Sequence, residues 1–256
     1  MRFRSPFTFK LRQLILLLAI TATAAILFSG LYISYQVQKE RVIEDTLKSN
    51  HVFASKLASA TDHFLIAAMQ QLEFSANIIV KDINNTELLQ LETNRLLKQT
   101  NSFNSVVINK LGVLKAASPA SLNIINKRVD SPHSKQAFKL QRPLISRPYV
   151  SLANNLMVII SYPLFDEAGN YYGYIGGSLY LEQQSILNAL LKQHSYDGGA
   201  YFYVVADDKT LLYHPVSERI GEVVQNNPVI NRVLKGEDGH ARVINSLGMH
   251  MLAGFS

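Results

Sequence analysis

The sequence predicts an α+β fold in which an N-terminal transmembrane helix continues into a long helix and two tandem antiparallel-sheet units follow. Three observations predict it: an uncharged apolar segment near the N-terminus, a helical spacing of apolar residues after it, and a strand–turn–strand pattern that occurs twice in the second half of the chain. With 256 residues, of which 48% are hydrophobic, the chain can bury folded cores, and this excludes a disordered polypeptide.

The apolar segment predicts one membrane span. No charged residue occurs between Gln13 and Gln38, and residues 14–35 are long enough for a hydrocarbon core, which needs about 20 apolar residues. A cleaved signal peptide is the alternative, because Ala22-Thr23-Ala24 resembles a cleavage site. The apolar run continues well beyond that site, which favours a retained anchor.

The charge distribution predicts the topology. The formal net charge is +6, and four basic residues precede the span: Arg2, Arg4, Lys10 and Arg12. Basic residues beside a span favour the cytoplasmic side, so we expect residues 1–13 to form a cytoplasmic tail and everything after about Gln38 to lie outside. The remaining sequence shows no Lys/Arg stripe with interleaved aromatic residues, so no nucleic-acid partner is expected.

The residue types that support catalysis or metal binding do not form recognisable patterns. The absence of cysteine excludes disulfides, thiolate zinc sites and cysteine nucleophiles. The seven histidines show no i, i+4 or H-x-x-E spacing, and no G-x-S-x-G elbow or phosphate-binding loop occurs. We therefore expect no catalytic residue, no metal site and no cofactor within this sequence.

After the span, apolar residues recur at every third or fourth position: Phe53, Leu57, Ala60, Phe64, Ala68, Leu72, Ser75 and Ile79. This spacing marks one face of a helix, so a single helix is expected from the membrane to about Lys81. The pattern breaks at Asn84-Asn85, and residues 87–99 predict a second, shorter helix. Residues 36–99 are thus interpreted as a stalk helix and a second helix.

Beyond Thr100 the sequence becomes rich in short runs of Val, Ile, Tyr and Phe separated by turn residues, which predicts strands. The expected strands are 103–109, 112–117, 144–151, 156–163 and 171–181, with a helix near 133–140 and hairpin turns at 154–155 and 166–170. Residues 182–193 predict a connecting helix.

The pattern then repeats. Residues 106–114 align with residues 204–212, each an apolar strand, a polar turn and an apolar strand. A second helical insertion at 228–234 and a strand pair at 240–245 and 249–255 extend the correspondence. We therefore expect two α+β units, at 100–193 and 194–256. The second has no counterpart of the strand at 171–181, and it is expected to be truncated.

Several segments resemble the double Cache sensor family: residues 145–151 (ISRPYVS), 158–166 (VIISYPLFD) and 169–181 (GNYYGYIGGSLYL). The resemblance covers the chain from about Gln38 onward. It implies a long helix followed by two PAS-like subdomains, the first membrane-distal and the second membrane-proximal. It also implies a homodimeric signalling protein of the bacterial inner membrane that binds a small extracytoplasmic ligand.

Further segments are most similar to sensors joined to diguanylate cyclases, which make cyclic di-GMP: residues 211–215 (LLYHP), 219–221 (RIG) and 251–254 (MLAG). Chemoreceptors and histidine kinases carry the same kind of sensor, so the output remains open between these three. A membrane-anchored structural or partner-binding module without a ligand is the alternative from another class.

The resemblance also implies where a ligand binds. The candidate ligand-binding residues lie in the first unit: His133, Arg147, Tyr149, Ser151, Tyr162 and Ser178. In family members that bind amino acids, two aspartates hold the ligand ammonium, and their positions fall on Ser151 and Ser178. An ammonium buried without a carboxylate is costly, so we expect an organic acid or another amine-free metabolite.

Overall fold

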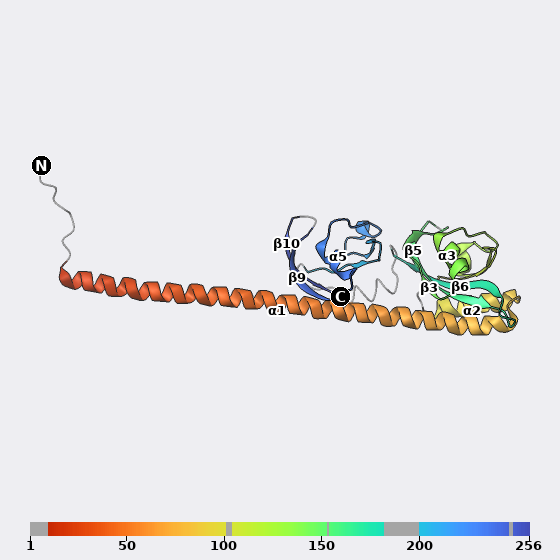
Figure 1. Ribbon diagram of the computed structural model, residues 1–256, viewed down its shortest axis with the longest axis horizontal. Coiled ribbons are helices and arrows are strands. Elements are labelled where there is room, and N and C mark those ends of the chain that lie inside the picture. The colour runs from red at the N-terminus through yellow and green to blue at the C-terminus, as the bar shows by residue number, and fades with distance from the viewer. Residues whose placement is uncertain (1–9, 101–103, 153, 182–199, 246–247) are drawn as a thin grey trace, which may run out of the picture.

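The chain is built on one very long helix. The computed structural model describes residues 10–100, 104–152, 154–181, 200–245 and 248–256. Helix α1 (Leu11–Ile79) has 69 residues, a 3-10 turn η1 (Val80–Asp82) ends it, and α2 (Thr86–Thr100) folds back along its end (Figure 1). The Asn85 Oδ1 accepts hydrogen bonds from the N–H groups of the first turn of α2, which explains why the chain restarts a helix there. The predicted long helix and second helix are confirmed.

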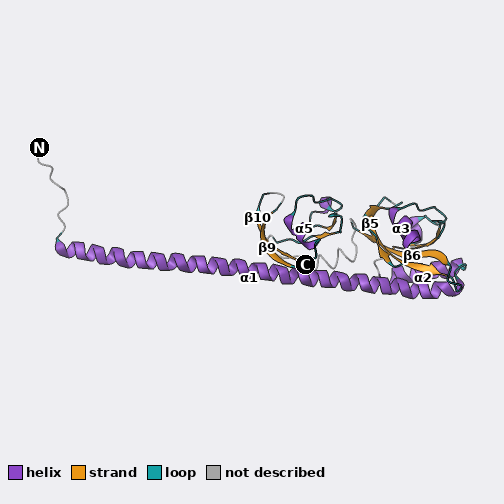
Figure 2. Cartoon of the chain, in the orientation of Figure 1, coloured by secondary structure: helices purple, strands orange, loops and turns teal. Residues whose placement is uncertain are grey.

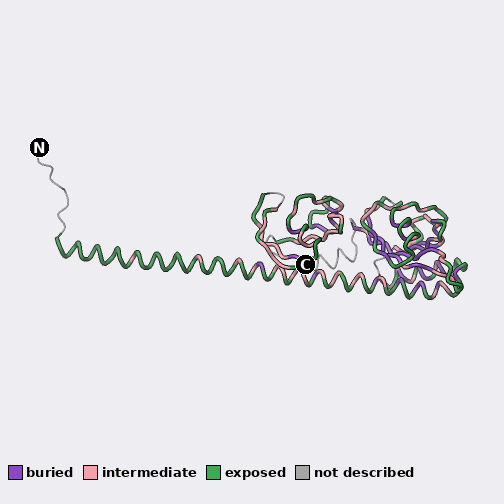
Figure 3. Tube along the Cα trace, in the orientation of Figure 1, coloured by how far each residue is buried: buried purple, intermediate pink, exposed green. Residues whose placement is uncertain are grey.

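The N-terminal part of α1 packs against no other described element. Figure 3 shows it almost entirely exposed, whereas buried residues gather where the sheet units sit. This helix is the one helix among the described residues that is long and apolar enough to cross a membrane, by length and composition. Ile26 and Phe28 are more than two-thirds exposed, and every large apolar side chain between Leu11 and Val37 is at least half exposed. Exposed apolar surface of this extent is expected of a helix whose surroundings are lipid.

The first unit is one antiparallel sheet. Its strands are β1 (Asn104–Asn109), β2 (Leu114–Ser118), β3 (Leu144–Ile145), β4 (Tyr149–Val150), β5 (Leu156–Phe165) and β6 (Tyr171–Tyr180). The order across the sheet is β2-β1-β6-β5-β3, and β4 pairs with β5 further along the same edge. The strands of this unit lie between α3 and the end of α1 (Figure 2). A short η2 (Ala120–Leu122) and helix α3 (Pro132–Leu140) lie between β2 and β3. The strands and the helix expected here are present, with one exception.

The exception is the strand expected at 144–151, which is split into β3 and β4. Pro148 lies in the gap and has no N–H to donate to β5. Ser146 partly replaces the missing ladder, because its Oγ accepts from the Ile159 N–H at 2.9 Å while its own N–H donates to the Ile159 carbonyl at 2.9 Å. The prediction of one continuous strand was therefore wrong.

The two faces of this sheet bury different partners. One face packs on α1 and α2 through a core that includes Leu72, Leu96, Val107 and Ile160. The opposite face is covered by α3 and includes Val106, Ile159 and Tyr174. Side chains therefore alternate along β1, β5 and β6 between a helix-bundle core and a layer beneath α3, as a sheet buried on both faces requires.

The second unit consists of two small hairpins and short helices. Strands β7 (Val204–Val205) and β8 (Leu211–Tyr213) pair with each other, as do β9 (Gly239–Ile244) and β10 (His250–Phe255). A 3-10 turn η3 (Ser217–Arg219) and helix α5 (Pro228–Val233) connect them. The connecting helix predicted at 182–193 lies outside the described residues.

The internal repeat is real, but its register differs by one residue from the predicted alignment. In the first unit the Asn109 N–H donates to the Val113 carbonyl and the Gly112 N–H donates to the Asn109 carbonyl. Ala206, Lys209 and Thr210 make the same two bonds in the second unit. Gly112 and Lys209 are thus equivalent, with φ of 78° and 69°. The alignment predicted from the apolar residues pairs Lys209 with Leu111 instead, one position away.

The second unit is docked on the middle of α1 through β10. A Cβ at Gly254 would overlap the backbone of Asn50 and His51, so the strand lies directly on the helix backbone. The Asn50 Nδ2 donates to the Leu252 carbonyl at 2.7 Å, and the His51 ring contacts the Asp238 carboxylate at 2.8 Å. Together with an ion pair between Arg242 and Glu40, these contacts fix the unit on α1 between its N-terminal apolar segment and the first sheet.

Candidate functional site

A cluster of buried polar side chains lies between α3 and the first sheet. Ser131 is the N-cap of α3 and Pro132 is its first residue, so the helix starts with His133 and Ser134 directed at the sheet. His133 is 2% exposed, and its Nε2 lies 2.9 Å from the Ser161 Oγ on β5. Its Nδ1 is buried and has no hydrogen-bond partner among the described residues. A buried nitrogen of this kind is costly unless a ligand group reaches it.

Hydroxyl groups continue the cluster from the cap of α3 to β6. The Ser131 and Ser134 hydroxyls are 2.9 Å apart, and Ser134 Oγ lies 2.8 Å from the Tyr174 hydroxyl. The Tyr149 side chain packs at the edge of the same layer. The cluster therefore presents hydroxyl and imidazole groups on both the helix and the sheet.

The groups of this cluster are uncharged at neutral pH. Burial lowers the pKa of His133 from 6.5 to about 4, so the ring is neutral. Burial likewise raises the pKa of Tyr149 to about 12 and that of Tyr174 further, so both keep their hydroxyl protons. No carboxylate belongs to the described cluster. It can bind hydroxyl, carbonyl or carboxylate oxygens, and it has no partner for an ammonium group.

The structure brings some of the predicted site residues together and separates others. His133 and Tyr149 belong to the cluster, and Ser178 lies on the same sheet face because it is four residues along β6 from Tyr174. Tyr162 lies on the opposite face, where its hydroxyl donates to the Glu73 carboxylate of α1 at 2.9 Å. Ser151 lies in the turn between β4 and β5, where its N–H donates to the Asn155 carbonyl.

Arg147 lies away from the cluster and joins the two units. Its Nε and Nη2 donate to the two carboxylate oxygens of Asp207 at 3.0 and 2.9 Å. The two side chains are 67% and 65% exposed, respectively. The break in the strand at 146–148 lets Arg147 turn toward the second unit instead of toward α3.

This position of Arg147 leads to a prediction about stability. Because exposed ion pairs contribute about 1 kcal/mol or less, Arg147→Gln should change the free energy of unfolding by no more than that amount. A double-mutant cycle with Asp207→Asn, measured by urea unfolding, isolates the pair. A coupling energy well above about 1 kcal/mol would contradict the prediction.

Sequence reasoning missed Ser161 and Tyr174, which supply the sheet side of the cluster. Both are buried, and both lie in segments already identified as strands. The available signal was the alternation along each strand, which puts Ser161 on the same face as Ile159, and Tyr174 on the same face as Ser178. The alternation alone does not say which of the two faces α3 covers.

Comparison with solved structures shows what this arrangement is similar to. The extracellular domain of the candidate histidine kinase rpHK1S-Z16 superposes with a TM-score of 0.71 at 15% identity, covering 81% of this chain and 87% of that one. The ligand-binding domain of the Pseudomonas aeruginosa amino acid chemoreceptor PctC, solved with GABA, gives 0.59 at 20% identity, covering 82% and 92%. The chain has the double Cache fold that the sequence predicts. No protein-family model matches the chain.

A third structural neighbour is a longer protein. The extracellular ligand-binding receptor of Desulfohalobium retbaense gives a TM-score of 0.63 at 14% identity, and the match covers 76% of this chain. The chain spans only 36% of that receptor's length. At these identities the likeness establishes the double Cache fold of the two units on α1. The ligand and the output have to be argued from this chain's own residues.

Proposed function

We propose that the protein is a membrane-anchored sensor whose first unit binds a small extracytoplasmic molecule and whose helix α1 passes the signal to the cell interior. One observation carries the proposal. A single unbroken helix, α1, joins the exposed apolar segment to both sheet units, and the buried polar cluster lies over the sheet that packs on its far end. Ligand contacts between α3 and the sheet can therefore shift the helix position between two states.

The topology is part of this proposal. The basic N-terminal residues favour a cytoplasmic tail at 1–13, a span at 14–35 in the lipid bilayer, and sheet units outside the inner membrane of a bacterium. The exposed apolar surface of α1 and the extracellular origin of the structural neighbours support the same orientation. We further propose a membrane-distal unit at 100–193, a membrane-proximal unit at 194–256 and a homodimer.

The ligand class follows from the charges of the cluster. His133 is neutral, the tyrosines keep their protons, and no carboxylate is present among the described cluster residues. An organic acid or another amine-free metabolite can accept hydrogen bonds from the hydroxyl groups, and these donors alone would hold a carboxylate, because Arg147 lies outside the cluster. An ammonium group would find no carboxylate among the described cluster residues. We therefore propose an amine-free ligand for the first unit.

A ligand screen tests this. The full chain in nanodiscs is titrated with organic acids and with α-amino acids while thermal unfolding is followed. We expect organic acids to raise the midpoint, and Tyr149→Ala to weaken the best of them by tenfold or more, about 1.4 kcal/mol, because the aromatic wall of the site is lost. Ser178→Asp should weaken acids and favour amines, because it adds a carboxylate on the same sheet face.

Tyr162→Ala is the matched control for this screen. It removes the same ring from the opposite face of the sheet, where it contacts Glu73 of α1. Its ligand affinities should equal those of the parent chain. Tight binding of an ordinary α-amino acid by the unmodified chain would refute the ligand class, and a ligand unaffected by Tyr149→Ala would place the site elsewhere.

For the output we propose a diguanylate cyclase, on the resemblance of residues 211–215, 219–221 and 251–254 to such sensors. A chemoreceptor or a histidine kinase is the second candidate, because the structural neighbours include both kinds. The cellular level of cyclic di-GMP, measured with and without the screened ligand in cells expressing the natural gene, separates them. An unchanged level would favour the second candidate.

A further inference from the structure

The second unit holds its own small cavity, separate from the polar cluster beneath α3. The cavity lies between the β7–β8 hairpin, η3, the start of α5 and the end of β9, and it leaves about 30 Å³ of space for the centres of water-sized atoms. Its lining residues are Tyr201, Tyr203, Leu211, His214, Arg219, Val224, Asn227, Ile230 and Asn245. The site is therefore polar on one side and apolar on the other.

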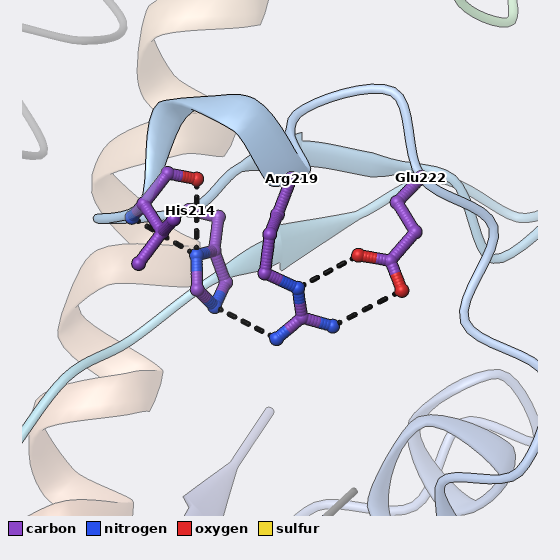
Figure 4. Close-up of polar contacts among 4 residues, drawn as sticks. His214, Arg219 and Glu222 are labelled. Atoms are coloured by element: carbon purple, nitrogen blue, oxygen red, sulfur yellow. Dashed lines mark hydrogen bonds and ion pairs between the residues drawn. The ribbon is translucent and has the colours of Figure 1, made fainter.

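Arg219 brings a guanidinium to this cavity, where the Glu222 carboxylate balances its charge. Its Nε and Nη2 donate to the two carboxylate oxygens of Glu222 at 2.7 and 3.3 Å (Figure 4). The remaining nitrogen, Nη1, is directed at the His214 Nε2, 3.3 Å away. Glu222 thus occupies one edge of the guanidinium and holds its plane, while the other edge lies along the cavity.

His214 presents a second donor beside that edge. The Val216 N–H donates to the His214 Nδ1 at 3.0 Å, which requires a lone pair on Nδ1 and places the proton of the neutral ring on Nε2. Burial and the neighbouring Arg219 lower the pKa of His214, so the ring is neutral. Two N–H groups then face each other, and an acceptor oxygen between them would satisfy both. In the other tautomer, with Nδ1 directed at the Val216 carbonyl at 3.2 Å, Nη1 still has a second hydrogen for the cavity.

The tyrosines add further donors. The Asn227 Nδ2 donates to the Tyr203 hydroxyl at 3.1 Å, and this leaves the Tyr203 hydrogen available to a ligand. The Asn227 Oδ1 is already used, because it caps α5 by accepting from the first N–H groups of the helix. Burial raises the pKa of Tyr203, so its hydroxyl keeps the proton.

The apolar side of the cavity limits the kind of anion. Leu211, Val224 and Ile230 line it, and the rings of Tyr201 and His214 meet edge to face with centroids 5.6 Å apart. An inorganic anion would leave this surface unused, whereas a short hydrocarbon chain would cover it. A carboxylate with a short alkyl chain matches both sides.

The internal repeat supports the same assignment. Each insertion helix begins with a capping residue followed by proline, Ser131-Pro132 in α3 and Asn227-Pro228 in α5. The capping residue of α5, Asn227, bonds to Tyr203, and the register of the repeat makes Tyr203 equivalent to Val106, which lies in the layer beneath α3. The cavity therefore occupies the position in the second unit that the polar cluster occupies in the first.

We propose that the second unit binds a small aliphatic monocarboxylate. Its oxygens accept hydrogen bonds from the Arg219 Nη1, the His214 Nε2 and the Tyr203 hydroxyl, and its alkyl chain lies on the apolar side of the cavity. This site is independent of the ligand site proposed in the first unit, so the protein integrates two chemical inputs along α1.

Ligand-observed saturation-transfer NMR tests the proposal. The full chain in phosphatidylcholine nanodiscs is titrated with acetate and propionate at an ionic strength held constant with chloride. We expect transfer to the methyl signals, with Arg219→Gln abolishing it. Tyr203→Phe keeps the ring and should weaken the affinity about tenfold, because one hydrogen bond to a charged group is lost. Far-UV circular dichroism of each variant verifies that the fold is retained.

Tyr213→Phe is the matched control, because Tyr213 lies on β8 but stacks on Phe202 in the core between the two units. Its affinity should equal that of the parent chain. Absence of transfer in the parent chain, equal competition by chloride or phosphate, or unchanged binding in folded Tyr203→Phe would overturn the proposal. Loss of binding in Tyr149→Ala, with binding kept in Arg219→Gln, would assign the carboxylate to the first unit instead.

Discussion

Gly254→Ala is expected to release the second unit from α1. A Cβ at this position would overlap the backbone atoms of Asn50 and His51, and backbone cannot yield by changing a rotamer. Strand β10 must then move away, which also breaks the bond from the Asn50 Nδ2 to the Leu252 carbonyl. We expect the free energy that holds β10 on α1 to fall by about 3 kcal/mol or more. Hydrogen exchange of the β9 and β10 amides measures the loss.

Gly30→Ala is the control for this change. It is the same substitution in α1, at a position where nothing lies within 4 Å of the added Cβ. Its exchange pattern in β9 and β10 should match that of the parent chain. If the β9 and β10 amides of Gly254→Ala exchange as slowly as those of the parent chain, the strand does not lie on the helix backbone.

The second large effect concerns pH and His133. Its pKa is lowered from 6.5 to about 4 in the folded protein, so the unfolded chain binds more protons between those values. Stability from this group is therefore present above pH 6.5 and is lost as the pH falls toward 4, by up to about 3 kcal/mol. We expect urea unfolding of the first unit to need markedly less denaturant at pH 4.5 than at pH 7.

His133→Gln should reduce this pH dependence, because the amide keeps a polar contact with Ser161 and does not take up a proton. His63→Gln is the matched control, since His63 is an exposed residue of α1 and its replacement should leave the pH dependence unchanged. If His133→Gln and the parent chain lose the same stability between pH 7 and 4.5, protonation of His133 is not the cause.

Much of the fold could be predicted because long apolar patterns have few alternatives. The three-and-four spacing from Phe53 to Ile79 sufficed for α1, and the apolar runs of β5 and β6 sufficed for the central hairpin. The details that failed depend on single residues. Pro148 interrupts a strand pattern that its neighbours satisfy. Lys209 adopts a left-handed conformation, which is uncommon for lysine and is not predicted from the residue type.

The site was harder to predict because it depends on packing between segments far apart in the sequence. His133 and Tyr149 were found through the family resemblance, whereas Ser161 and Tyr174 become visible only once α3 is placed over the sheet. In the sequence, Arg147 and Tyr162 are equally good candidates for ligand binding, because both are polar residues in predicted strands. The structure separates them, because one reaches Asp207 and the other reaches Glu73.

The unbroken course of α1 determines how it can move. Within its 69 residues it contains no proline and one glycine, Gly30, so it has few of the usual causes of a kink. A straight helix of this size is about 100 Å long and behaves as a stiff rod over that distance. Bending therefore costs more than moving the whole helix along its axis or turning it about that axis. A displacement of one ångström beneath the first sheet would reach the bilayer almost undiminished, and the apolar segment would register it as a change in depth or rotation.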